Sequence, residues 1–188
     1  ERSAVLTGDE ARSGDVIMGL ASSGLHSNGF SLVRRIVDDG GFDYAADAPF
    51  DPTKTLGRSL LEPTKIYVKS CLAALQCGGV HGFAHITGGG LLDNIPRVLP
   101  DGLGASIDVS AWPLPPVFGW LAQNGAIEPL ELAWTFNCGI GMAVIAAPDK
   151  AAEIDAALTG AGETVITIGA VTEGDGVVLE NIDTAWAT

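Results

Sequence analysis

The sequence predicts one domain with a mixed α and β fold. Its 188 residues fit a single domain with a substantial buried core. Hydrophobic residues make up 47% of the chain, which argues against a disordered protein. Short apolar runs alternate along the chain with segments in which apolar residues recur at helical spacing. This alternation is typical of strands and helices that follow one another.

The first part of the chain alternates in this way. A strand is expected over 15–20, followed by a loop over 21–28. Apolar residues four apart, Leu32 with Ile36 and Val33 with Val37, predict a helix over 29–38 that two glycines end. The proline-containing stretch 42–55 is expected to be a surface loop. A second helix is expected over 64–76.

The same criteria predict the later elements. Asp149 is expected to cap the last helix, and a glycine-containing turn at 173–176 separates the last two strands. The remaining strands are expected over 82–86, 105–109, 140–146, 165–171 and 177–179, and the remaining helices over 91–98, 115–123, 128–136 and 149–158.

The charge balance narrows the classes of partner. The formal net charge is -13 and the isoelectric point is about 4.3. Because this charge repels a phosphate backbone, we expect no nucleic-acid partner. We also expect no membrane partner, since no apolar run is long enough to span a bilayer and the polar start at Glu1 shows no signal peptide. The three cysteines do not have metal-site spacing, so we expect reduced thiols and no metal site.

One loop, Ser22-Ser23-Gly24-Leu25-His26-Ser27-Asn28-Gly29, joins a predicted strand to a predicted helix. Glycines allow close backbone approach, and the start of a helix presents unpaired N–H groups with a partial positive charge. Together with short polar side chains, these features are typical of an anion site. His26 adds a group that titrates near neutral pH. The alternative is structural: Ser27 or Asn28 caps the helix, and His26 is a turn residue.

A second loop, His85-Ile86-Thr87-Gly88-Gly89-Gly90, again joins a strand to a helix. Three successive glycines are costly to order, so they fit where the backbone lies close to a ligand or another chain. Asp93 and Asn94 follow at helical spacing and could face the same opening. The alternative is a flexible turn, with His85 packed at the strand end. Neither loop has the Walker or dinucleotide-binding pattern.

Three further polar residues are weaker candidates. Thr64 and Lys65 place a hydroxyl and a cation where an extended segment meets a helix, and Lys65 could pair with a phosphate. Asn137 precedes an apolar strand and could reach a ligand. The structural alternatives are a solvated lysine at a helix start and an asparagine that caps a turn.

Four segments together resemble the family of phosphoribosylformylglycinamidine cyclo-ligases, also called aminoimidazole ribonucleotide synthetases. They are the first loop within 20–33, Glu-Pro-Thr-Lys within 61–68, the second loop within 84–100, and Phe-Asn-Cys-Gly within 135–142. They occur in the family's order and span nearly the whole chain.

The resemblance implies a three-layer α/β/α fold of the α+β class, with a mixed, partly ferredoxin-like sheet flanked by helices. It also implies a homodimeric cytoplasmic enzyme that uses ATP and Mg²⁺ to convert formylglycinamidine ribonucleotide to aminoimidazole ribonucleotide, ADP and phosphate. In that family, an N-terminal domain carries much of the ATP and metal site and the central dimer contact. The 188 residues correspond to the C-terminal domain alone, so we expect the isolated chain to be nearly inactive.

Site roles follow from the same resemblance, motif by motif. The first loop would line the substrate side of a cleft through Ser22, Ser23, His26 and Asn28. The second would line the reaction centre or a phosphate through His85, Thr87, Gly88, Gly89 and Gly90. His26 is the first candidate for proton transfer or charge stabilisation and His85 the second, while Thr64, Lys65 and Asn137 are supporting residues.

Two other functions remain open at this point. One is a sister ATP-dependent enzyme, such as selenophosphate synthetase, thiamine-phosphate kinase or the hydrogenase-maturation dehydratase. The two histidine-containing loops together favour the cyclo-ligase over these. The other is a non-catalytic module that binds a phosphate ligand or assembles with a partner.

Overall fold

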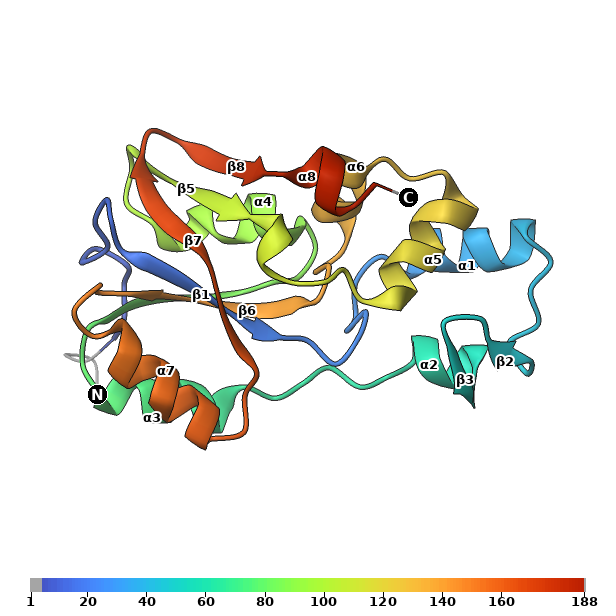
Figure 1. Cartoon of the computed structure of the whole chain (residues 1–188), viewed down its shortest axis with the longest axis horizontal. Coiled ribbons are helices and arrows are strands. Elements are labelled where there is room, and N and C mark those ends of the chain that lie inside the picture. Colours follow the sequence, from blue (N-terminus) through green and yellow to red (C-terminus); the bar gives the residue numbers. More distant parts are fainter. Residues whose placement is uncertain (1–4, 188) are drawn as a thin grey trace.

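A single six-stranded sheet organises the molecule. A computed structural model describes residues 5–187 (Figure 1), so the predicted polar start at Glu1 lies outside the described residues. The strand order is β4-β6-β1-β7-β5-β8, and every neighbouring pair is antiparallel except β5 and β8, which are parallel. The predicted mixed sheet is therefore confirmed. The strands are β1 (Val16–Ala21), β4 (Val80–His85), β5 (Leu103–Asp108), β6 (Ile140–Ala146), β7 (Val165–Glu173) and β8 (Gly176–Glu180).

Helices cover both faces of the sheet and make the predicted three layers (Figure 1). Alternation along β1 shows the two faces, because Met18 and Leu20 join one core cluster while Ile17 joins the other. The cluster with Met18 lies under α3 (Val68–Gln76) and α7 (Ala151–Gly160). The other, larger cluster lies under α1 (Phe30–Asp39), α4 (Gly90–Asn94), α5 (Pro116–Gly125) and α6 (Pro129–Thr135). A short α8 (Ile182–Ala185) follows the last strand.

The last two strands follow each other directly along the chain, but they do not pair with each other. Strand β5 lies between them, so the connecting turn crosses the start of β5. Gly104 makes the crossing feasible, because a Cβ there would lie 2.5 Å from the carbonyl oxygen of Gly176. The predicted turn is confirmed, while its path across a third strand depends on the tertiary structure.

Three local predictions were wrong. The stretch 42–55 contains a small hairpin, β2 (Asp47–Ala48) and β3 (Asp51–Thr55), which leads into α2 (Leu56–Leu60). The helix expected from residue 64 begins at Val68, because residues 62–67 form neither helix nor strand and pass the end of β1, where the Lys65 and Tyr67 side chains bond to the Ala21 carbonyl. Lys150, and not Asp149, is the N-cap of α7, and its side chain makes no capping hydrogen bond.

The sheet topology brings the two predicted loops together. Both β1 and β4 are antiparallel to β6, so they run parallel to each other and end at the same edge. Ala21 at the end of β1 is opposite Ile140, and His85 at the end of β4 is opposite Met142. The loops that follow these strands therefore lie on either side of the beginning of β6.

Candidate functional site

Three aromatic rings mark the place where the two loops meet. The ring centroids of His26 and His85 are 6.5 Å apart, and the ring of Tyr67 lies 6.3 Å from each of them. Gly141 of β6 lies beneath this group, since a Cβ there would come within 2.6 Å of a His26 ring carbon. The structure thus joins both predicted histidines, and it adds Tyr67, which the sequence analysis did not select.

The two histidines differ in accessibility. His26 is 4% exposed, whereas His85 is exposed at the end of β4. The Nε2 atom of His26 accepts hydrogen bonds from the backbone N–H groups of Ser23 (3.2 Å) and Lys65 (3.5 Å). Its buried Nδ1 has no hydrogen-bond partner among residues 5–187. His85 is therefore the histidine that a ligand in solution reaches first.

The environment of His26 keeps its ring neutral. Burial, followed by the nearby His85 and Lys65 side chains, lowers its pKa from 6.5 to about 4. Because Nε2 accepts two N–H groups, the single ring proton resides on Nδ1. In this conformation His26 Nε2 is a hydrogen-bond acceptor that links its own loop to the segment around Lys65.

Asn137 connects the serine-rich loop to the turn before β6. This fully buried side chain accepts a hydrogen bond from the Ser22 hydroxyl (3.0 Å) and donates one to the Gly24 carbonyl (2.8 Å). It also accepts the N–H of Gly139, in a turn where Cys138 has a φ of 48°. Asn137 therefore connects the first loop to the turn before β6 from a buried position.

Side chains of the first loop also contact the extended segment before α3. The Ser23 hydroxyl donates to the carbonyl of Pro63 (2.7 Å), and the hydroxyls of Ser27 and Thr64 lie 3.3 Å apart. The helix after the loop has Gly29 as its N-cap, with a φ of 73° and no side-chain cap among the described residues. Neither Ser27 nor Asn28 caps this helix, so no N-cap side chain accepts a hydrogen bond from the first N–H groups of α1.

The three glycines of the second loop have different roles. Gly88 is exposed and has open space around it, so it is the glycine that a ligand can approach. Gly89 begins α4 with a φ of 94°. Gly90 is buried, and a Cβ there would lie 1.8 Å from the carbonyl oxygen of Ala133, so it is needed for helix packing. That the three glycines line the reaction centre or a phosphate stays a prediction; the structure leaves Gly88 exposed and buries Gly90.

Asn94 shapes this loop from behind. Its buried amide nitrogen donates to the carbonyls of Gly90 (2.7 Å) and Gly88 (3.2 Å), and its oxygen accepts the hydroxyl of Thr87 (3.2 Å). Asn94 therefore faces the backbone of the loop. Its helical spacing had suggested instead that it could face the opening.

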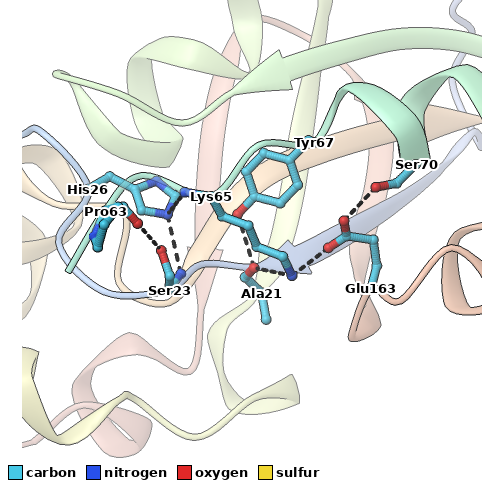
Figure 2. Close-up of polar contacts among 8 residues, drawn as sticks. All are labelled: Ala21, Ser23, His26, Pro63, Lys65, Tyr67, Ser70 and Glu163. Atoms are coloured by element: carbon cyan, nitrogen blue, oxygen red, sulfur yellow. Dashed lines mark hydrogen bonds and ion pairs between the residues drawn. The ribbon is translucent and has the colours of Figure 1, made fainter.

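Lys65 is held by a buried acid that the sequence analysis missed (Figure 2). Its Nζ lies 2.6 Å from Glu163 Oε2 and 3.4 Å from the Ala21 carbonyl, which also accepts the Tyr67 hydroxyl at 3.0 Å. Glu163 is 8% exposed and lies between α7 and β7. Burial and the nearby Glu163 carboxylate raise the pKa of Tyr67. No motif surrounds Glu163, so its importance depends on the fold alone.

Two hollows adjoin the site. An apolar groove of about 470 Å³ is lined by Lys65, Tyr67 and His85 together with Ile66, Val68, Cys71, Leu72, Leu75, Phe83 and Met142. A more polar pocket of about 320 Å³ lies beside Ser22 and Ser23 and includes Lys54 and Glu62, which form an ion pair of 2.8 Å. The site is thus an open surface between two hollows.

Residues 5–187 contain no group of three or more histidine, cysteine, aspartate or glutamate side chains that could hold a metal ion. In the same range, no helix has the length and apolar character needed to cross a membrane.

Solved structures share this fold along nearly the whole chain. Thiamine-monophosphate kinase from Stenotrophomonas maltophilia is similar with a TM-score of 0.64 and 19% identity, covering 95% of this chain and 54% of the kinase. The E. coli hydrogenase maturation protein HypE has a TM-score of 0.58 and 19% identity, covering 93% and 48%. T. maritima PurL, solved with AMPPCP, has a TM-score of 0.52 and 18% identity, covering 93% and 24%. The chain thus spans about half the length of the first two.

The sequence itself identifies the family. Residues 12–181 match the family described as "AIR synthase related protein, C-terminal domain". This range includes both histidine-containing loops, the extended segment at Lys65 and the turn at Asn137. The chain therefore belongs to the AIR synthase related protein family, as its C-terminal domain.

Proposed function

We propose that the chain is the C-terminal domain of an ATP-dependent phosphoribosylformylglycinamidine cyclo-ligase. The observation that carries this proposal is the meeting of the serine–histidine loop and the histidine–triple-glycine loop at one edge of the sheet, beside the start of β6. Either loop alone is compatible with several members of the family. Together with the segments at Lys65 and Asn137, they match the cyclo-ligase pattern in order.

The reaction would proceed in two steps. ATP transfers its terminal phosphoryl group to the amide oxygen of formylglycinamidine ribonucleotide, which leaves ADP and an activated carbon. The lone pair of an internal nitrogen then attacks that carbon, the C–O bond breaks, and phosphate leaves with the bonding electrons. After loss of a proton from that nitrogen, the imidazole ring of the product is complete.

The residues of this chain would serve positioning and charge stabilisation. Backbone N–H groups near Gly88 and at the uncapped start of α1 would face phosphate oxygens, which is the chemistry that helix starts and glycine loops supply. His85, as the exposed histidine, would accept or donate the proton at the reacting nitrogen. His26 would hold the first loop in the shape that the substrate needs.

A second domain would complete the site. The groove beside Lys65, Tyr67 and His85 continues into a strongly exposed apolar surface that includes Ile66 (81% exposed), Val68 (61%) and Leu72 (56%). We propose that this surface contacts a second domain. That domain would correspond to the half of thiamine-monophosphate kinase and of HypE that this chain does not match. That domain would supply most of the ATP and Mg²⁺ ligands and the dimer contact.

The test is ATP-dependent formation of aminoimidazole ribonucleotide by the protein joined to a family N-terminal half, with purified His85→Ala and His26→Ala variants. We expect product from the parent, a kcat loss of about 100-fold or more for His85→Ala with unchanged stability, and a loss of both stability and activity for His26→Ala. His81→Gln is the matched control, because His81 lies at the other end of β4 and pairs with Asp15.

Absence of product from a folded parent would contradict the cyclo-ligase proposal. The same protein would then be tested for ATP-dependent phosphorylation of thiamine monophosphate, because the kinase fold has a TM-score of 0.64 to this chain. Equal activity of parent and His85→Ala would retain the function and remove the proton-transfer role of His85.

A further inference from the structure

We infer that Glu163 is a positioning residue of the candidate site, and that it acts through Lys65 on the loop that carries His26. The relevance of this inference to catalysis rests on the proposed function, but its test uses only the chain itself. No sequence motif and no predicted site residue includes Glu163.

The first step of the argument is the burial of the carboxylate. Glu163 is 8% exposed and lies beside the core layer between the sheet and the helices α3 and α7. A buried carboxylate is costly unless charged and hydrogen-bonding partners surround it. One oxygen pairs with Lys65 Nζ at 2.6 Å, and the other accepts the hydroxyl of Ser70 at the beginning of α3. Both partners lie within residues 65–70, a stretch that begins with the last residue of the Glu-Pro-Thr-Lys segment.

The second step is the position that this pair gives to Lys65. The ammonium group also donates to the Ala21 carbonyl, the last residue of β1, where the Tyr67 hydroxyl donates as well. The side chain of Lys65 thus lies along the end of β1 (Figure 2). Its Nζ is 5.5 Å from the centroid of the Tyr67 ring. The Lys65 side chain is thus engaged with protein groups, and its pairing with a phosphate stays a prediction.

The third step links this pair to the first loop. The backbone N–H of Lys65 donates to His26 Nε2, next to the N–H of Ser23. The side chain and the backbone of one residue therefore connect Glu163, on the turn before β7, with His26, on the loop after β1. Loss of the carboxylate releases the side chain of Lys65 and loosens the hydrogen bond that its backbone makes.

Amide hydrogen exchange, read at single residues by NMR, tests the inference. We expect Glu163→Gln to increase exchange about tenfold at the amides of Ser23 and Lys65, with a change in the ring ¹⁵N signals of His26. Lys65→Met should give the same local changes. The double variant should be no worse than either single variant, because both substitutions interrupt one connection. Glu153→Gln is the matched control, since it breaks the exposed Lys150–Glu153 pair on α7.

Unchanged exchange at both amides and unchanged His26 signals in Glu163→Gln would overturn the inference, even if the protein became less stable. Additive effects in the double variant would overturn it as well, because Glu163 would then act by a route that bypasses Lys65. If Glu163→Gln does not fold, Ser70→Ala removes only the second hydrogen bond of the carboxylate and should increase the same two exchange rates by a smaller factor.

Discussion

The imidazole of His26 and the backbone N–H of Lys65 form a hydrogen bond of 3.5 Å that joins the first loop to the segment before α3. The same Nε2 accepts the Ser23 N–H, so the shape of the loop depends on a neutral ring. Protonation of Nε2 would replace the acceptor with a donor that faces two other donors.

Stability should therefore decrease with acidification in a defined window. The folded-state pKa of His26 is lowered to about 4 from an ordinary value of 6.5, so below pH 6.5 the unfolded chain binds a proton that the folded chain does not. The stabilisation is complete above pH 6.5 and decreases as the pH falls toward about 4. Its upper limit is ~3 kcal/mol. Urea unfolding at several pH values should show this slope, and His26→Gln should flatten it.

The control for this slope is His85→Gln. Because burial is the leading cause of the lowered pKa and His85 is second, this variant should retain most of the slope. A slope unchanged in His26→Gln would mean that other groups produce the acid sensitivity.

Alanine substitution should destabilise the protein much more at Gly90 than at Gly88. Gly90→Ala should lower the free energy of unfolding by about 3 kcal/mol or more, because its Cβ would overlap the Ala133 carbonyl. Gly88→Ala should change stability by less than ~1 kcal/mol, because no atom lies within 4 Å of the added Cβ. Thermal or urea unfolding measures both. Equal losses at the two positions would contradict the packing role assigned to Gly90.

Asn137→Ala should be strongly destabilising. The substitution removes the hydrogen bonds that Asn137 makes with Ser22, Gly24 and Gly139. It leaves the buried Gly139 N–H without its partner, whereas the Gly24 carbonyl keeps the Ser22 hydroxyl at 3.1 Å, so the total cost is about 2–4 kcal/mol. Asn124→Ala is the comparison, because Asn124 is exposed and its side chain donates a hydrogen bond to the Trp120 carbonyl. If both variants lost the same stability, Asn137 would not be the link between the loops.

The exposed apolar surface that includes Leu72 should contribute to stability only in a protein that contains both domains. Leu72→Ser is expected to change the unfolding free energy of the isolated chain by no more than ~0.5 kcal/mol, because the side chain is 56% exposed. In a protein that contains both domains, the same change should loosen domain contact, measured as increased proteolysis between the domains. Leu130→Ser, on α6 and 58% exposed, is the matched control. Identical behaviour of the two variants would argue against a domain contact at this surface.

The main elements of the fold could be predicted because their signals are local. The sequence predicts strand β6 with its observed bounds, since six of its seven residues are hydrophobic. The apolar spacing of Leu32, Val33, Ile36 and Val37 predicted α1 to within a residue. The predicted start of α3 is too early, because nothing local shows that residues 62–67 stay outside the helix and bond to His26 and Ala21.

The candidate site was predicted in part for the same reason. Glycines and histidines beside strand ends gave His26, His85 and the glycine loop, and the family resemblance assigned them one site. The burial of these side chains could not be predicted, so the more accessible histidine ranks second, and for Asn137 the sequence leaves both alternatives open, contact with a ligand or capping of a turn. Glu163 and Tyr67 gave no signal, because their importance comes only from what lies next to them.

The sequence by itself determined the mixed α and β class, the two loops that carry polar chemistry, and the family, because these depend on residue type and order along the chain. Only the tertiary structure decided that β1 and β4 end on either side of the beginning of β6, that His26 is buried while His85 is exposed, and that Lys65 pairs with Glu163. The physical reason is that solvent exposure and the pairing of charges depend on which distant segments pack together, and this information is not present in any local stretch of sequence.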